Sequence, residues 1–327
     1  MLLFVKDRGY SRWSSMMNCE SGLRRRILLT RFKLSDIPSP ILLQGNERIA
    51  YRDPAVIYQD GVFRLYCTLT ETEPDGTVYM YTAMSQSRDL LRWTEPKKLT
   101  PRDRSLNFSS PGNIIRFRDK WVMCLQTYPR PNGEKYGNRT SRIWMMESTD
   151  LDRWSAPELL KVKGDDVPVE QMGRMIDPYL IESNDEPGKW YCFYKQNGVS
   201  VSCSYDLEKW TFCGNENAGE NVCILNLEDQ YVMFHSPENG IGIMRSSDLR
   251  HWTHDDVLLT FGQREWDWAR GRITAGFVLD CRQVQGIEKF LMFFHGSGPE
   301  DEHIIFDTHA CIGLAWSDDL REWSWPR

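Results

Sequence analysis

The sequence predicts an all-β fold, a single-domain five-bladed β-propeller with four antiparallel strands in each blade. Two patterns carry this prediction. Aromatic and β-branched runs opened by turn residues recur along the chain, and each is followed by the heptapeptide Ser-x-Asp-Leu-x-x-Trp. A repeat of about 40–50 residues is the length of one propeller blade, so five copies predict five blades around one axis. The copies are Ser87–Trp93, Ser148–Trp154, Ser204–Trp210, Ser246–Trp252 and Ser317–Trp323.

Each repeat is expected to contain the same elements in the same order. In the fourth, Val222–Leu225 is the inner strand, Tyr231–Phe234 the second strand and Ile241–Ser246 the third. The heptapeptide then turns the chain into an outer strand. Its residues suit this structural task better than a ligand site, because Asp can bond the backbone of the turn that follows it. Leu is expected to fill the blade, and Trp to pack between neighbouring blades.

The repeats set the predicted domain boundaries. Residues 49–327 form the propeller, with no helix of any length. Residues 1–48 do not repeat, and we expect an N-terminal extension that either caps one face or adds an outer strand to close the ring.

Composition excludes several classes of function. The net charge of −6 argues against a nucleic-acid partner, and no apolar run is long enough to cross a membrane. The first residues lack the features of a secretory signal, so a cytoplasmic location is expected. The nine cysteines show no C-x-x-C spacing. Cys67, Cys124 and Cys192 fall inside apolar strands and are expected to be buried hydrophobes, not metal ligands or disulfides.

Three of the five inner strands open with a carboxylate, namely Asp53, Asp177 and Glu220. Because inner strands line the axis and their first residues face one mouth of the channel, these acids are expected to meet there. Glycosidic bond cleavage needs such a set: one acid protonates the leaving oxygen, and a carboxylate activates water or attacks the sugar. A third can hold the acid protonated by like-charge repulsion. The alternative is that each Asp-Pro pair simply starts a strand.

The segment Arg174–Ile181, followed by Gly188–Tyr194, resembles the Ile-Asp-Pro strand and Gly-Lys-aromatic-Tyr hairpin of glycoside hydrolase family 43. That family has relatives in families 32, 62 and 117, and the resemblance covers about residues 50 to 325. It implies that Asp53 is the general base, that Asp177 tunes and orients the acid, and that Glu220 is the general acid. It also implies inversion at the anomeric carbon. Family 32 enzymes instead retain the configuration, but their Asn-Asp-Pro-Asn-Gly start and C-terminal sandwich are absent.

The sequence departs from the family at two places. The family usually reads Glu-Gly-Pro at the acid, whereas this chain reads Glu220-Asn221-Val222. Three other glutamates are weaker candidates for the acid, each expected at the surface: Glu170, Glu216 and Glu265. Thr274 stands where many members place a histidine near a central metal or water, so no metal or cofactor is predicted.

Two histidines end second strands, His235 and His295. Both could reach the channel, but a structural role is preferred for each. Six residues on loops feeding the same mouth are expected to bind substrate: Arg52, Asn113, Arg174, Trp266, Trp268 and Arg272.

The expected function is hydrolysis of short oligosaccharides, exo-acting, with arabinofuranosides or xylosides as substrates. A carbohydrate is thus the expected partner. Two alternatives stay open. One is an inactive propeller that binds carbohydrate, and the other is a phosphorylase, for which the cluster Arg270-Gly271-Arg272 is the only candidate phosphate site.

Overall fold

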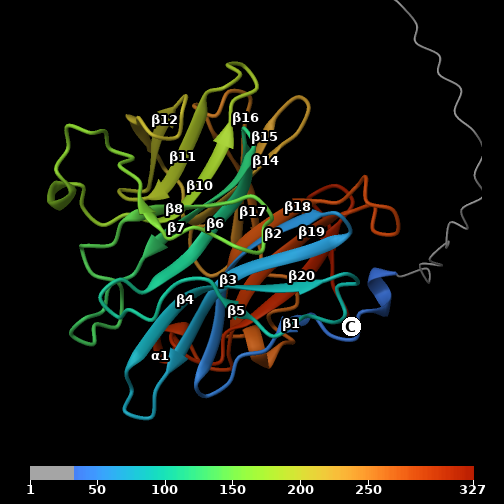
Figure 1. The fold of residues 1–327 in the computed structure, drawn as a ribbon. Helices are drawn as coiled ribbons and strands as arrows, with labels where there is room; N and C mark the ends of the chain where they lie inside the picture. The colour runs from blue at the N-terminus through green and yellow to red at the C-terminus, as the bar shows by residue number, and fades with distance from the viewer. Residues whose placement is uncertain (1–32) are drawn as a thin grey trace, which may run out of the picture. The chain divides into compact units, whose positions relative to one another are not determined.

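The computed structural model describes residues 33–327, which form five antiparallel sheets, four with four strands each and one with five (Figure 1). This confirms the predicted five-bladed propeller. The first blade contains β2 (Ile49–Gln59), β3 (Val62–Thr72), β4 (Val78–Ser87) and β5 (Lys97–Lys98). The second contains β6 (Phe108–Phe117), β7 (Lys120–Thr127), β8 (Ile143–Ser148) and β9 (Glu158–Leu159). The third contains β10 (Ile176–Glu182), β11 (Trp190–Lys195), β12 (Val199–Ser204) and β13 (Thr211–Glu216).

The fourth blade contains β14 (Glu220–Asn226), β15 (Tyr231–Ser236), β16 (Ile241–Ser246) and β17 (Thr253–Leu259). The fifth contains β18 (Arg272–Asp280), β19 (Phe290–Ser297) and β20 (Cys311–Ser317), with β21 (Trp323–Ser324) paired to β20. Helical structure in residues 33–327 is limited to α1 (Glu302–Ile305) and three short 3-10 turns. These turns are η1 (Leu34–Asp36), η2 (Val169–Gln171) and η3 (Asp267–Ala269).

The fifth blade is built from both ends of the described chain. Strand β1 (Ile41–Leu43) pairs antiparallel with β20, with Ile41 opposite Gly313. Part of the predicted N-terminal extension therefore supplies a strand of the propeller. The rest of that extension, residues 1–32, lies outside the described residues.

The recurring heptapeptide joins one blade to the next. In the first copy, Asp89 Oδ1 accepts hydrogen bonds from the backbone N–H groups of Leu91 and Arg92, at 3.0 and 2.9 Å. The same pair of bonds recurs in the other four copies. In the second copy, the ring of Trp154 lies edge-on to Tyr66 of the preceding blade. The Tyr66 hydroxyl in turn donates to the carbonyl of Leu151 at 2.9 Å. These contacts confirm the structural role predicted for the motif.

The cysteines predicted to be structural are buried in the apolar interior. Cys67, Cys124 and Cys192 are fully inaccessible and form no disulfide. Burial raises the pKa of the Cys67 thiol, which keeps it neutral in its apolar setting. In the part of the chain that the structure describes, no helix is long and apolar enough to cross a membrane.

The hydrogen bond from the Tyr66 hydroxyl to the Leu151 carbonyl, which joins two blades, yields a stability prediction. Tyr66→Phe should lower the free energy of unfolding by about 1–2 kcal/mol, because it leaves the buried Leu151 carbonyl without its donor. The measurement is urea denaturation monitored by tryptophan fluorescence. Tyr205→Phe is the control, since Tyr205 is exposed, and it should change stability by less than about 0.5 kcal/mol. Equal losses in the two variants would contradict the proposed joint.

Candidate active site

Every inner strand contains a β-bulge at the same place, where its pairing with the second strand shifts register. One residue in each bulge has a positive φ, in the left-handed region that non-glycine residues rarely adopt. These residues are Asp53 (49°), Ser110 (42°), Asp177 (51°), Asn221 (54°) and Ala275 (53°). Bulges redirect side chains and are frequent beside active sites. Two of the three predicted catalytic acids therefore occupy equivalent, strained positions.

The backbone N–H of four bulge residues is satisfied by a side chain from the second strand of the preceding blade. Acceptors in β3, β7, β15 and β19 fill this role, so each blade holds the bulge of the next. The pairs are Ser110 to Thr68 Oγ1 (2.7 Å), Asp177 to Gln126 Oε1 (2.6 Å), Ala275 to Ser236 Oγ (2.9 Å) and Asp53 to His295 Nδ1 (3.5 Å).

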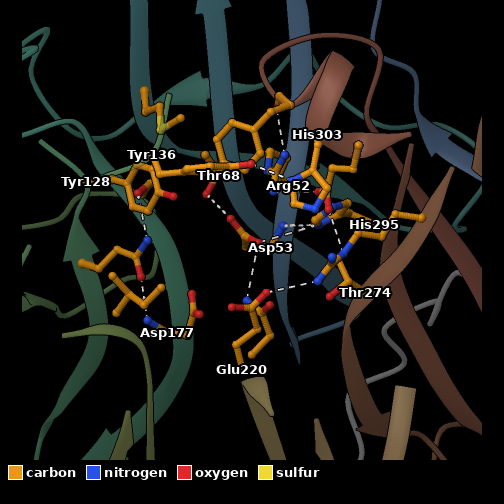
Figure 2. Close-up of a pocket in the computed structure, with 18 of the residues that line it drawn as sticks. Arg52, Asp53, Thr68, Tyr128, Tyr136, Asp177, Glu220, Thr274, His295 and His303 are labelled. Carbon is orange, nitrogen blue, oxygen red and sulfur yellow. Dashed lines mark hydrogen bonds and ion pairs between the residues drawn. The ribbon is translucent and has the colours of Figure 1, made fainter. Parts of the chain in front are cut away.

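The bulges surround a pocket of about 230 Å³. All three predicted catalytic acids line it, and Figure 2 shows Asp53, Asp177 and Glu220 directed into the same space. Three of the six predicted substrate-binding residues also line it: Arg52, Arg174 and Arg272. Most of the predicted site is therefore brought together.

Asn113, Trp266 and Trp268 are placed elsewhere. The Asn113 amide is buried and bonds both backbone groups of Leu180, at 2.7 and 2.9 Å, so it joins the second blade to the third. Trp266 and Trp268 stack with ring centroids 5.1 Å apart and pack against Phe294. They line a separate surface hollow, because η3 directs this segment toward β1 and the C-terminal residues.

Asp53 is held in a setting that favours its ionised form. Its Oδ2 accepts a hydrogen bond from Thr68 at 2.9 Å, and its Oδ1 lies 3.7 Å from His295 Nδ1. Burial alone would raise the pKa of this carboxyl. The opposing contacts with His295, the adjacent Arg52 guanidinium and Thr68 outweigh burial, so the Asp53 pKa lies below its ordinary value.

Asp177 has the opposite character. It is buried and accepts a hydrogen bond from Ser110 Oγ at 2.9 Å. Burial, followed by the negative charges of Glu220 and Asp53, raises the Asp177 pKa to about 8. Two carboxyls at equivalent backbone positions are thus driven to different charge states by their neighbours.

Glu220 precedes its bulge by one residue, and Asn221 takes the left-handed position. This explains why Glu-Asn-Val can stand where the family reads Glu-Gly-Pro. The second position needs a positive φ, which Gly adopts freely and Asn tolerates better than most residues. Glu220 Oε1 lies 3.2 Å from Arg272 Nη2. Its side chain is 35% exposed, compared with 16% for Asp53.

The rival glutamates and the candidate phosphate site lie apart from this arrangement. Glu170, Glu216 and Glu265 do not line the pocket. Arg270 is paired with Asp267 at 2.5 Å, and Arg272 is paired with Glu220 and Glu302. Both arginines of the cluster are therefore engaged by carboxylates. In residues 33–327, no three His, Cys, Asp or Glu side chains converge as metal ligands would.

The two histidines differ in placement. His235 accepts a hydrogen bond from the Gly219 N–H at 2.8 Å, and burial, with the charges of His254 and Lys195, lowers its pKa to about 4. The preferred structural role fits this residue. His295 instead reaches the channel and lines the pocket beside Asp53. Its position in the strand pairing could have predicted this. His295 is paired with Thr274 just before the bulge of the fifth inner strand, as Thr68 is paired with Arg52 before the bulge of the first.

One pocket residue that sequence reasoning missed is Glu302, in α1. Its side chain is 7% exposed and forms ion pairs with Arg52, Arg272 and His295. No repeat signal could have indicated it, because α1 belongs to the long connection between β19 and β20.

Two long connections close one side of the pocket. They are residues 128–142 of the second blade and residues 298–310 of the fifth. Arg130 pairs with Asp307 through two contacts, at 2.6 and 2.9 Å, and the Tyr136 hydroxyl lies 2.6 Å from His303 Nδ1. Figure 2 shows Tyr136 and His303 side by side above Asp53. We call this pair of contacts the loop clamp.

Solved structures of glycosidases share this architecture. An α-L-arabinofuranosidase from Lactobacillus brevis matches with a TM-score of 0.59 and 12% identity, covering 88% of this chain and 95% of that one. The catalytic domain of a family 62 α-L-arabinofuranosidase from Coprinopsis cinerea gives 0.55 and 12%, covering 85% and 98%. A family 43 enzyme from Xanthomonas citri, complexed with xylose, gives 0.57 and 11%, covering 89% and 94%.

The chain has the fold of the family 43 and 62 glycosidases. The resemblance drawn from the Ile-Asp-Pro strand and its hairpin is thus confirmed at the level of architecture. No protein-family model matches the sequence, and no curated protein does.

The left-handed position of Asn221 yields a stability prediction. Asn221→Val should lower the free energy of unfolding by about 1–3 kcal/mol, because a β-branched residue is strained at positive φ. Asn221→Gly is the matched variant, since Gly adopts that conformation freely, and it should stay within about 0.5 kcal/mol of the parent. Urea denaturation measures both. Comparable losses in the two variants would refute the conformational argument.

The raised pKa of Asp177 yields a pH prediction. Folding binds a proton at Asp177 between its ordinary pKa of 3.8 and its folded value of about 8. Over that window the parent should lose stability with rising pH relative to Asp177→Asn, since the variant has no charge to bury. Near pH 4 the two should be closest, and above about pH 8 the difference should level off. Melting curves across pH measure it, and a pH-independent difference would contradict the assignment.

Proposed function

We propose that this protein is a glycoside hydrolase, in which Asp53 is the general base and Glu220 the general acid. The observation that carries the proposal is the meeting of Asp53, Asp177 and Glu220, from three blades, in one pocket. Hydrolysis with inversion needs an ionised carboxylate to activate water and a protonated carboxyl to donate to the leaving oxygen. The lowered pKa of Asp53 suits the first task.

Asp177 supports the second task. Its pKa is raised first by burial and then by repulsion from Glu220 and Asp53, of which Glu220 contributes more. At neutral pH this repulsion keeps a proton on the pair formed by Asp177 and Glu220. Glu220 is the member with the more exposed side chain, so it is placed to deliver that proton to a bound glycoside.

The loop clamp supports exo action on short oligosaccharides. By joining connections from the second and fifth blades, it borders the pocket on one side, which favours the end of a sugar chain over a chain that runs through. The rings of Tyr128, Tyr136 and Phe306 lie on this side, and aromatic faces suit the apolar faces of a sugar. Two of the matched structures are α-L-arabinofuranosidases and the third holds xylose, which favours pentose substrates, α-L-arabinofuranosides or β-D-xylosides.

The test is release of 4-nitrophenol from a panel of aryl glycosides. Asp53→Asn and Glu220→Gln should each lower kcat roughly 10²- to 10⁴-fold. The loss in Glu220→Gln should shrink with a 2,4-dinitrophenyl leaving group, which departs without protonation. The loss in Asp53→Asn should not shrink. Glu265→Gln, an exposed rival acid, is the matched control and should retain full activity.

Three outcomes would count against the proposal. A parent protein that cleaves no member of the panel would favour the inactive carbohydrate-binding propeller. Turnover that requires added inorganic phosphate would favour a phosphorylase. Full activity in Glu220→Gln would remove Glu220 from the acid role. Proton NMR of the first-formed sugar tests inversion, and release of single sugars from an oligosaccharide tests exo action.

A further inference from the structure

Glu302 is a buried carboxylate that contacts two arginines and a histidine at once. Its Oε1 lies 2.8 Å from Arg52 Nη2 and 2.9 Å from His295 Nε2, and its Oε2 lies 2.7 Å from Arg272 Nε. A carboxylate is costly to bury unless its oxygens are fully paired. Burial would raise the pKa of Glu302, but Arg52, His295 and Arg272 hold it well below the ordinary range. Glu302 is therefore a fixed negative charge in the floor of the pocket.

Two of these partners continue to the catalytic carboxyls. With Nε2 engaged by Glu302, the His295 ring presents Nδ1 to Asp53, 3.5 Å from its backbone N and 3.7 Å from Oδ1. On the other side, Arg272 Nε lies 2.7 Å from Glu302 Oε2, an ion pair without hydrogen-bond alignment, and Arg272 Nη2 donates a hydrogen bond to Glu220 at 3.2 Å. One side chain thus orients the neighbours of both acids.

The chain needs no Glu302 to form a blade. In the first, third and fourth blades, the second and third strands are joined by short turns, at residues 73–77, 196–198 and 237–240. In the fifth blade the same connection spans residues 298–310 and carries α1. An insertion thus carries Glu302 to the pocket. There, two of its partners, His295 and Arg272, each contact a catalytic carboxyl.

We propose that Glu302 is a positioning residue that fixes the partners of the catalytic pair, His295 for Asp53 and Arg272 for Glu220. The inference rests on the proposed function. Because Glu302 pairs with Arg272 at 2.7 Å and with His295 at 2.9 Å, it holds both side chains where each contacts a catalytic carboxyl. Without Glu302, neither side chain would be fixed in that position.

Glu302→Gln tests this, because it removes the charge and keeps the shape. On an aryl glycoside that the parent cleaves, kcat should fall roughly 10- to 100-fold, with KM changed less than about threefold. The loss should be larger for 4-nitrophenyl glycosides than for 2,4-dinitrophenyl glycosides, whose leaving group departs without protonation. Glu300→Gln, in the same connection but exposed, is the control and should match the parent.

Glu302→Asp separates positioning from folding. It keeps the charge at a shorter reach, so it should recover part of the kcat that Glu302→Gln loses. Melting curves identify any loss of folded protein in either variant. A parental kcat in Glu302→Gln, or a loss confined to KM, would overturn the inference while leaving the glycosidase proposal intact. A parent with no glycosidase activity would instead overturn the proposed function.

Discussion

The site depends on one backbone constraint, the left-handed bulge repeated in all five inner strands. A residue at positive φ breaks the pairing with the second strand and turns its side chain and its N–H group out of the regular ladder. The freed N–H must then be satisfied in the interior. In four of the five blades a side chain of the preceding blade does so, as Thr68 does for Ser110. The geometry of Asp53 and Asp177 is thus set by a neighbouring blade as much as by their own.

This arrangement lets one backbone position support opposite electrostatics. Asp53 and Asp177 have nearly the same φ, yet the pKa of the first lies below its ordinary value and that of the second far above it. The difference lies in what the ring of blades brings to each. Asp53 meets His295 and Arg52, whereas Asp177 meets Ser110 and the field of two other carboxyls. The repeat gives both aspartates the same backbone position, and the neighbours that differ between repeats shift their pKa values in opposite directions.

The same distinction explains what the sequence could predict. The repeated heptapeptide and the alternating strands were sufficient for five blades, and their register placed Asp53, Asp177 and Glu220 together. The strand pairing also indicated His295, which is paired just before a bulge. Glu302 and the loop clamp lie in insertions that follow no repeat, so only the folded chain shows where they go.

The three misplaced substrate residues share another cause. Asn113, Trp266 and Trp268 were assigned to the mouth from their proximity to inner strands along the chain. Asn113 lies beyond its bulge, where its amide meets the backbone of the next blade. The tryptophans precede β18 but pack on Phe294 of β19, because a large apolar ring gains more by burial than by exposure at a polar mouth. Distance along the chain was a poor guide wherever a side chain could pack against another element.

The shared fifth blade has a consequence for the assembly of the molecule. Strand β1, from the beginning of the described chain, completes a sheet whose other strands come from its end. Asp53, in the first blade, receives its histidine from a residue 242 positions later, in that last blade. The environment of the proposed base therefore cannot exist in a chain that lacks the fifth blade. The proposed activity therefore depends on closure of the ring of blades. Recovery of that activity during refolding would report the closure.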